Sequence, residues 1–485
     1  MENKPNIILI NCDDLGYGDL ACYGSEKHDT PNLDRLAEGG TRFTDFYMAS
    51  PVCSPSRGAM LTGCYPPRIG FASFDGDIVL FPGHDLGLNP SEITIARLLK
   101  DAGYSTMMVG KWHCGDQPEF LPTSHGFDDY YGIPFSNDMG RMVRRESAPP
   151  LPLMSGADVI QEQPDQTAIT ERYTEKSVSF IRKNKDRPFF LYLAHMHVHL
   201  PLYAAAPFVE KSRAGDYGAC VMAIDWSTGV LVDELKRQGL YENTLILFTS
   251  DNGSRNDFGG NNGKLRGTKS TTWEGGLRVP LIAHWPGKIK PSVCGELVTS
   301  MDLYPTLASI GGAEIPRDRI IDGIDISGLL LGKTEKSPRD TFFYYMADKL
   351  EAVRRGKYKL FVSRGPGGKV LLPWQEQALA ESGQSVENQT EDGKLVIPEN
   401  KAVYELYDLS VDIGETNNIY DQRPDIVAEL TKLIEECRTD LGDAVAGVKG
   451  THARPAGRVS NPRPLTEYNE DHPYIIALYD RDEIG

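Results

Sequence analysis

The chain has 485 residues, of which 40% are hydrophobic and 25% are charged. These values are ordinary for a globular protein, and the length allows one large domain with a smaller one beside it. The formal net charge of −17 at pH 7 argues against nucleic acid or an anionic membrane surface as a partner.

Neither a membrane span nor a disulfide framework is expected. No run of about 20 apolar residues occurs. The eight cysteines form no CxxC pair and no regular spacing, so we expect mostly free thiols. The apolar part of residues 1–10 is too short and too early for a secretion signal. We therefore expect a cytoplasmic protein, or an exported one if a leader has been removed from this sequence.

The first predicted strand ends in two adjacent carboxylates. Residues 6–11 form an apolar run typical of a buried parallel strand, and Asp13 and Asp14 follow it. Adjacent carboxylates repel one another unless a cation or hydrogen bonds compensate them. Open α/β sheets place their functional sites at such strand ends. The alternative is an acidic turn that is merely solvated.

Residues 50–63, SPVCSPSRGAMLTG, predict a loop that turns into a helix. We expect Ser54 to cap this helix, with residues 57–61 helical. Cys53 would then lie at the positive end of the helix dipole, with Arg57 one turn further on. That setting favours negative charge on or near Cys53. The alternative is a buried structural cysteine beside a surface arginine.

The chain up to residue 335 alternates between strand and helix patterns. Helical periodicity predicts helices at residues 31–37, 95–102, 169–181 and 221–235. Apolar runs predict further strands at residues 104–109, 189–194, 244–249 and 279–283. Residues 71–90 and 141–168 are rich in turn-forming residues and read as surface loops. This alternation predicts an α/β fold with a large, mostly parallel sheet flanked by helices.

Polar side chains follow the predicted strands at their carboxyl ends. They are Lys111 and His113, then His195, His197 and His199, then Asp251 and Asn252. Right-handed crossovers bring parallel strand ends to one edge of a sheet, so we expect these residues to gather near Asp13 and Asp14. Carboxylate and amide oxygens suit Ca²⁺ or Mg²⁺. A zinc site made by the three histidines, or a Lys/His pair that faces solvent, remains an alternative.

The pattern changes beyond residue 335. Residues 341–346 and 351–362 read as antiparallel hairpins, and residues 402–407 as a further strand. Apolar spacing at residues 426–437 predicts an amphipathic helix. Residues 366–400 read as a long irregular segment, and the tail after Gly442 is expected to wrap the surface. We therefore predict two domains, residues 1–335 and a smaller α+β subdomain at residues 336–485.

Several motifs together resemble one known family. Cys53-Ser-Pro-Ser-Arg57, followed by Leu61-Thr-Gly63, resembles the signature of the type I, formylglycine-dependent sulfatases of the alkaline phosphatase superfamily. Gly110-Lys-Trp-His, Gly132-Ile-Pro-Phe-Ser and Trp273-Glu-Gly-Gly are similar to the arylsulfatase A and N-acetylgalactosamine-6-sulfatase branch. The resemblance covers residues 5–312 closely. It implies that residues 1–335 are the catalytic domain of a hydrolase that cleaves sulfate monoesters.

The resemblance also implies a role for each motif residue. In this family a dedicated maturation enzyme oxidises the cysteine, here Cys53, to formylglycine, whose hydrated aldehyde is the nucleophile. The metal, normally Ca²⁺ with Mg²⁺ as the alternative, would be bound by Asp13, Asp14, Asp251, Asn252 and the converted Cys53. The implied catalytic residues are Cys53, Arg57, Lys111, His113, His199 and Lys269. The implied substrate-binding residues are Lys111, Ser136, His197, His199 and Lys269.

The implied partners are the maturation enzyme and a sulfated substrate, either a carbohydrate or an aryl sulfate. The branch resemblance favours a 6-sulfated galactose or N-acetylgalactosamine. Two other functions stay open. One is a phosphonate or phosphodiester hydrolase of the same superfamily, which can carry a similar cysteine motif. The other is a non-catalytic carbohydrate-binding relative in which Cys53 is never converted.

Overall fold

The computed structural model describes residues 4–141, 149–365, 401–463 and 465. The predicted irregular segment at residues 366–400 and the last part of the predicted tail lie outside these residues. Among the described residues, no helix has the length and apolar character that crossing a membrane requires. All eight cysteines are free thiols, as predicted.

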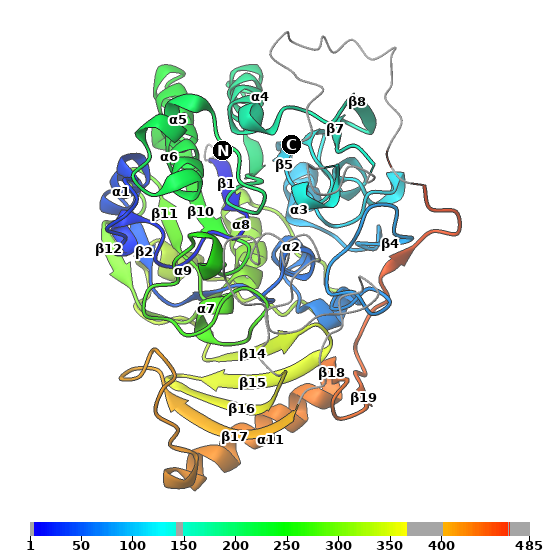
Figure 1. Cartoon of the computed structure of the whole chain (residues 1–485), viewed down its shortest axis with the longest axis vertical. Helices are drawn as coiled ribbons and strands as arrows, with labels where there is room; N and C mark the ends of the chain where they lie inside the picture. The colour runs from blue at the N-terminus through cyan, green and yellow to red at the C-terminus, as the bar shows by residue number, and fades with distance from the viewer. Residues whose placement is uncertain (1–3, 142–148, 366–400, 464, 466–485) are drawn as a thin grey trace.

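A ten-stranded sheet lies at the centre of the described residues (Figure 1), in the order β12-β2-β11-β10-β1-β9-β5-β6-β7-β8. The five strands from β10 to β6 run parallel, whereas β11, β7 and β8 are antiparallel to their neighbours. The strands are β1 (Asn6–Cys12), β2 (Thr41–Phe43), β5 (Ser105–Gly110), β6 (Asp129–Gly132), β7 (Pro152–Ser155), β8 (Asp158–Glu162), β9 (Phe189–Ala194), β10 (Thr244–Ser250), β11 (Leu281–His284) and β12 (Ser292–Cys294). The predicted parallel arrangement therefore holds for the centre, and the edges are mixed.

The prediction of an irregular surface loop at residues 141–168 is wrong in its second half. Residues 152–162 contain the hairpin β7–β8, which extends the sheet beyond β6. Leu153, Met154, Val159 and Ile160 are buried in this hairpin. Each strand is short, and prolines precede and begin the first, which concealed the alternation that marks a strand.

Helices cover both faces of the sheet. Ile8 and Ile10 of β1 pack in one core with α1 (Pro31–Glu38), α4 (Ile169–Lys183) and α6 (Gly215–Arg237). Ile7 and Leu9 point the other way, into a core with α2 (Cys53–Thr62), α3 (Ile95–Asp101) and α8 (Leu303–Gly311). Successive strand residues face opposite sides of a sheet, and both sides are buried here. That is why the inner strands are continuously apolar.

The C-terminal part forms a second, smaller sheet, as predicted. The antiparallel strands β14 (Thr341–Met346), β15 (Lys349–Arg355), β16 (Tyr358–Arg364) and β17 (Lys401–Asp408) carry α11 (Pro424–Leu441) on one side. Their other side packs on Tyr47 and on α7 (Glu274–Leu277) of the large domain. The predicted fold class, an α/β domain with a smaller α+β unit, is confirmed. The boundary near residue 335 stays a prediction.

Short elements complete the described chain. Strands β3 (Phe46–Tyr47) and β13 (Val298–Thr299) pair, as do β18 (Gly442–Asp443) and β19 (Val448–Lys449). Helix α5 (Ala206–Lys211) packs against α6, and α9 (Ser327–Leu330) packs against α8. The tail returns to the large domain, where β20 (Gly457–Arg458) pairs with β4 (Leu86–Gly87). The described part of the tail therefore wraps the surface, as predicted.

The carboxyl ends of four inner strands meet at one edge. In the parallel pairing, Cys12 of β1 lies opposite Ser250 of β10, and Gly110 of β5 lies opposite Ala194 of β9. The residues that follow these strands are therefore delivered to one place, as the order of motifs along the sequence predicted.

Candidate active site

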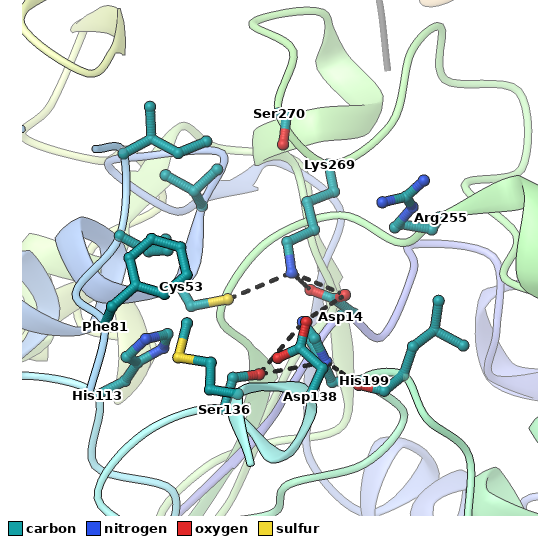
Figure 2. Close-up of a pocket in the computed structure, with 15 residues that line it drawn as sticks. Asp14, Cys53, Phe81, His113, Ser136, Asp138, His199, Arg255, Lys269 and Ser270 are labelled. Atoms are coloured by element: carbon teal, nitrogen blue, oxygen red, sulfur yellow. Dashed lines mark hydrogen bonds and ion pairs between the residues drawn. The ribbon is translucent and has the colours of Figure 1, made fainter. Parts of the chain in front are cut away.

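A pocket opens at this edge of the sheet (Figure 2). Six of the residues that line it were singled out in the sequence, namely Asp14, Cys53, His113, Ser136, His199 and Lys269. Arg57, Lys111 and Asp251 are fully buried and do not line the pocket. The strand ends therefore supply polar side chains to the pocket, with a second layer of charged groups beneath them.

Cys53 is the first residue of α2, and its side chain is buried. Val52, which is extended, occupies the N-cap position, so the predicted cap at Ser54 is wrong. Ser54 lies within the first helical turn, and its Oγ instead accepts a hydrogen bond of 3.1 Å from the backbone N–H of Leu80. This bond ties α2 to the loop at residues 71–90.

The thiol of Cys53 lies between charges of opposite sign. Its Sγ is 3.5 Å from Asp13 Oδ1 and 3.3 Å from Lys269 Nζ. Burial raises the pKa of Cys53 well above its ordinary value, and the opposing effect of Lys111 and Lys269 does not outweigh it. Desolvation therefore outweighs the favourable effect of the helix end on negative charge at the Cys53 thiol. An unmodified thiol here is protonated and a poor nucleophile.

The carboxylates of Asp13 and Asp14 are each matched by a lysine. Lys111 Nζ donates to Asp13 Oδ2, and Lys269 Nζ donates to Asp14 Oδ2 over 2.9 Å. Burial raises the pKa of Asp14, but Lys269 and His199 outweigh it and hold that pKa well below its usual range. Asp14 is therefore ionised. Its left-handed backbone, with φ of 62°, turns the chain directly after β1.

Arg57 holds the strand ends together from below. Its Nε donates to Asp251 Oδ2 over 2.9 Å, and its NH1 donates to the Lys111 carbonyl over 2.6 Å. Burial and the neighbouring Asp13 raise the pKa of Asp251 to about 6, even though Arg57 opposes this. Arg57 thus connects α2 to the strands β5 and β10.

Several potential metal ligands converge beside Cys53. Ligand atoms of Asp13, Asp14, Cys53 and His199 all lie within 4.8 Å of one another. Asn252 Oδ1 is buried and accepts no hydrogen bond from the part of the chain that the structure describes, while Asn252 Nδ2 donates to Asp14 Oδ1 over 2.7 Å. Buried acceptors without donors are costly unless a ligand satisfies them. The oxygen-rich set fits a hard cation such as Ca²⁺ or Mg²⁺.

Asp251 is less directly placed for a cation than Asp13 and Asp14. Its Oδ1 accepts from the backbone N–H of Asp14 over 3.2 Å, and its Oδ2 is bound by Arg57. Among the described residues, the ligand cluster includes His199 but neither His195 nor His197. A zinc site made by the three histidines therefore does not form in this part of the chain.

Ser136 and His199 form a polar wall beside the lysines. Ser136 Oγ is 3.3 Å from Lys111 Nζ and 3.3 Å from His199 Nδ1. His199 Nε2 is 3.8 Å from Asp14 Oδ2. Burial, assisted by Lys269, lowers the pKa of His199 to about 4, so the ring is neutral near pH 7. A nearby anion would raise this pKa again.

His113 enters the pocket from an unusual backbone conformation. Its φ of 60° departs from the extended segment expected from sequence, so it does not simply repeat the direction of Lys111. Its Nε2 is 2.9 Å from the Leu80 carbonyl, which can only accept, so Nε2 carries the proton. The buried Nδ1 has no hydrogen-bond partner among the described residues and therefore offers a lone pair. Burial lowers the pKa of His113 well below its ordinary value, with Lys111 adding to the effect.

His197 is not brought to the pocket. Its ring is buried 6.4 Å from that of Tyr203 and does not line the pocket. Burial lowers its pKa to about 4. The substrate-binding role implied for His197 thus has no contact with the pocket to support it.

The sequence did not single out the remaining pocket residues. They are the apolar Val52, Ile78, Val79, Phe81, Met139 and Leu200, and the polar Asp138, Arg255 and Ser270. The guanidinium of Arg255 pairs with Asp257 at 2.9 Å and lies 5.2 Å from the Phe258 ring. Most of these residues come from loops, where no periodicity marks them. Asp138 could have been found, because it follows Ser136 in the same turn.

Comparison with known proteins gives the family. The family model "Sulfatase" matches residues 5–313, and that of the "C-terminal region of aryl-sulfatase" matches residues 337–455. Human arylsulfatase A is 41% identical over 448 residues, covering 86% of this chain and 84% of the relative. N-acetylgalactosamine-6-sulfatase of Canis lupus familiaris is 41% identical over 374 residues, covering 73% and 71%.

A solved structure shares the whole architecture. The crystal structure of Ps i-CgsB in complex with k-i-k-neocarrahexaose superposes with a TM-score of 0.75 at 29% identity, covering 93% of this chain and 96% of the other. The family models, the relatives and this structure agree with the motifs gathered in the pocket. The chain belongs to the sulfatase family, the hydrolases of sulfate esters.

Proposed function

We propose that this protein hydrolyses a sulfate monoester of a sugar in the pocket around Cys53, after a maturation enzyme has converted that cysteine to formylglycine. The observation that carries the proposal is the contact of Lys269 Nζ with both Cys53 Sγ, at 3.3 Å, and Asp14 Oδ2, at 2.9 Å. This contact places the ammonium group of Lys269 beside Cys53, the residue that the family motif marks for conversion.

The charges beneath the pocket suit an anionic substrate. Asp13, Asp14 and Asp251 are paired with Arg57, Lys111 and Lys269. Carboxylates and cations are equal in number, so the cluster alone is close to neutral. A divalent cation would make it positive, and a buried positive site attracts a sulfate group more strongly than an exposed one.

We propose that the cation is Ca²⁺, held by Asp13, Asp14 and Asn252, with Asp251 behind them. When bound, it supplies a Lewis acid that stabilises negative charge on the sulfuryl oxygens. The orphaned Asn252 Oδ1 and the hard oxygen ligands support this assignment. The ammonium groups of Lys111 and Lys269 already donate hydrogen bonds to the carboxylates of Asp13 and Asp14.

The other residues have chemistry that suits the reaction. The converted Cys53 side chain supplies the hydroxyl nucleophile. His113 Nδ1, a buried lone pair, can accept a proton beside it. Ser136 and Lys269 can donate hydrogen bonds to sulfate oxygens. A bound sulfate would raise the pKa of His199, which then becomes able to donate a proton to the leaving oxygen.

The rest of the pocket supports a sugar as the leaving group. Ile78, Val79 and Phe81 give it an apolar wall, and Arg255 with Asp138 adds polar groups. Carbohydrate-binding sites commonly combine the face of an aromatic side chain, on which a sugar ring packs, with hydrogen-bonding groups. The similarity to an N-acetylgalactosamine-6-sulfatase and to a structure in complex with k-i-k-neocarrahexaose supports the same class of substrate.

The test is turnover of a panel of mono- and disaccharides sulfated at single defined positions, alongside phosphate esters with the same leaving groups. The proposal expects at least one sulfated sugar to be hydrolysed far faster than its phosphate counterpart. Faster turnover of phosphate esters or phosphonates would refute it in favour of the other hydrolase class. Absence of turnover by protein with fully converted Cys53 would refute sugar sulfate hydrolysis.

A further inference from the structure

We propose that Lys359 is a positioning residue: from the small C-terminal sheet, it holds the loop that presents Lys269 to Cys53 and Asp14. This inference rests on the proposed function of Lys269. It assigns the C-terminal subdomain a part in the reaction, although none of its described residues lines the pocket.

Lys359 lies on β16 and is fully buried. Its ammonium contacts three oxygens of the described chain, the Thr272 carbonyl at 2.8 Å, Glu274 Oε1 at 3.0 Å and Glu415 Oε1 at 2.7 Å. The first two contacts are hydrogen bonds donated by the ammonium group, and the third is an ion pair. The Tyr344 ring, with its centroid 4.0 Å from Nζ, closes the site.

Two of these three contacts belong to the segment that carries Lys269. Thr272 is three residues beyond Lys269, and Glu274 begins α7. Glu415, which follows β17, adds a second hold, because its Oε2 accepts from the backbone N–H of Glu274 over 2.8 Å. The C-terminal subdomain thus binds the Glu274 side chain through Lys359. It also binds the segment's backbone, at the Thr272 carbonyl through Lys359 and at the Glu274 N–H through Glu415.

A neighbouring strand strengthens the attachment. Thr272 Oγ1 donates to Glu351 Oε2 on β15, and the Trp273 ring packs on Phe361 of β16 with centroids 4.7 Å apart. Three consecutive residues, Thr272 to Glu274, are therefore fixed to β15 and β16. Glu351 and Lys359 come from the two adjacent inner strands, so the loop is held at two points of the sheet.

On its pocket side the same loop is tied to the active-site segments. Lys269 N–H donates to the Ser254 carbonyl over 3.1 Å, and Ser270 N–H donates to the Pro51 carbonyl over 2.9 Å. Ser270 has a φ of 66°, a conformation that a non-glycine residue adopts only when its surroundings impose it. The loop is short and constrained at both ends. A shift at Thr272 therefore moves Lys269.

The charges explain why a lysine is needed. Burial raises the pKa of Glu415 to about 7, while Lys359 and Arg278 hold the pKa of Glu274 near 2 against the effect of burial. Without the ammonium group, the two carboxylates would face each other in a dry interface. Repulsion would then push Glu274, and the loop before it, away from the small sheet.

The experiment is a double-mutant cycle between Lys359 and Lys269. Lys359→Met is combined with Glu415→Gln, so that no unpaired charge remains, and this pair is made with and without Lys269→Ala. Every protein is checked for folding by thermal unfolding, and kcat and KM for a small aryl sulfate are normalised to the converted fraction of Cys53. Lys357→Met, on an exposed lysine next to β16 that pairs with Asp408 at 2.7 Å, is the matched control.

The Lys359→Met/Glu415→Gln pair should lower kcat/KM about 10-fold or more in the presence of Lys269, and by less than about twofold in the Lys269→Ala background. Lys357→Met should leave kcat/KM unchanged. Equal losses in both backgrounds, or no loss in folded protein, would overturn the inference while leaving the proposed function intact. If Lys269→Ala itself keeps the full rate, the proposed role of Lys269 fails, and this inference fails with it.

Should the paired variant not fold, Lys359→Arg keeps the charge and Thr272→Val removes only the hydroxyl bonded to Glu351. Either single change should displace the loop from the small sheet: a guanidinium is larger than the ammonium group that the Tyr344 ring encloses, and the Thr272 change removes the bond to Glu351. Each should show the same dependence on Lys269. Losses that are independent of Lys269 in both variants would overturn the inference equally.

Discussion

Lys269 Nζ lies 3.3 Å from Cys53 Sγ and 2.9 Å from Asp14 Oδ2, so one ammonium group bridges Cys53 and a metal-ligand candidate. Lys269→Ala should lower kcat by about 10²–10³-fold, the usual cost of losing a preorganised donor to developing negative charge. Steady-state kinetics with a small sulfate ester as substrate measures this change in kcat. Lys264→Ala, exposed on the same loop, is the control and should keep the wild-type rate. A kcat within about threefold of wild type for folded Lys269→Ala would contradict the assignment.

Cys53 itself should not survive as a thiol in active protein. Burial keeps the thiol protonated, so we expect activity to depend on its conversion to an aldehyde. Intact-mass analysis of the peptide that contains Cys53 should show a loss of about 18 Da relative to cysteine. Specific activity should rise in proportion to the converted fraction. Cys64, a buried thiol just beyond α2, is the internal control and should keep its mass. Full activity from protein with only thiol at Cys53 would refute this prediction.

A divalent cation should stabilise the protein through Asp13. Added Ca²⁺ should raise the free energy of unfolding by about 2.7 kcal/mol at 100 times its Kd, and Asp13→Asn should abolish most of that gain. Thermal unfolding with and without chelator, with Ca²⁺ and Mg²⁺ compared, measures both effects. Asp29→Asn, which changes an exposed carboxylate paired with Arg213, should respond as wild type does. An equal response from Asp13→Asn would show that the stabilising cation binds elsewhere.

Asp19 should make stability depend on pH. Its Oδ2 accepts hydrogen bonds from the Tyr217 hydroxyl and, over 2.7 Å, from the backbone N–H of Gly16. Burial raises the pKa of Asp19 to about 7, even though these two hydrogen bonds oppose the rise. A raised pKa means that its stabilising contribution is complete below the unfolded value of about 4 and is lost as pH rises through about 7.

Thermal unfolding between pH 4 and pH 8 tests this effect of Asp19. The variant Asp19→Asn should lose less stability than wild type over that range, because an amide does not titrate. Asp29→Asn serves again as the surface control and should follow the wild-type curve. Parallel curves for wild type and Asp19→Asn would show that Asp19 keeps an ordinary pKa.

Much of the site could be predicted because each part follows a buried parallel strand. Such strands read as continuous apolar runs, so the polar residues directly after them stand out, as Asp13 and Asp251 do. The start of α2 could not be read correctly. Ser54 is a favourable capping residue by type, but the side chain is recruited by Leu80 in a distant loop. Tertiary contacts overrode the local preference.

The connection between the two sheets was beyond what the sequence could predict. Lys359 and Glu274 are 85 positions apart, and Glu415 lies further along the chain. Each alone is an ordinary charged residue, and no spacing rule links them. Only the packing of the small sheet on α7 shows that they share one buried site. The same holds for Arg255, which a loop carries into the pocket.

Arg255 should select among substrates. It lines the pocket from a loop beyond β10, and its bidentate pair with Asp257, at 2.9 Å, fixes the guanidinium in place. Arg255→Ala should lower kcat/KM about 10–100-fold for a sulfated disaccharide, the usual cost of losing a hydrogen bond from a charged group. It should leave turnover of a small aryl sulfate almost unchanged, because Lys269, His199 and Cys53 stay in place.

Comparing the two substrate classes on one variant separates recognition of the sugar from the chemistry at sulfur. Arg237→Ala, an exposed arginine at the end of α6, is the control and should treat both substrates as wild type does. A uniform loss on both substrates would mean that Arg255 supports the reaction itself. Wild-type rates on both substrates would mean that the sugar does not reach the Arg255 side of the pocket. Selectivity would then have to come from other parts of the pocket, such as the wall around Phe81.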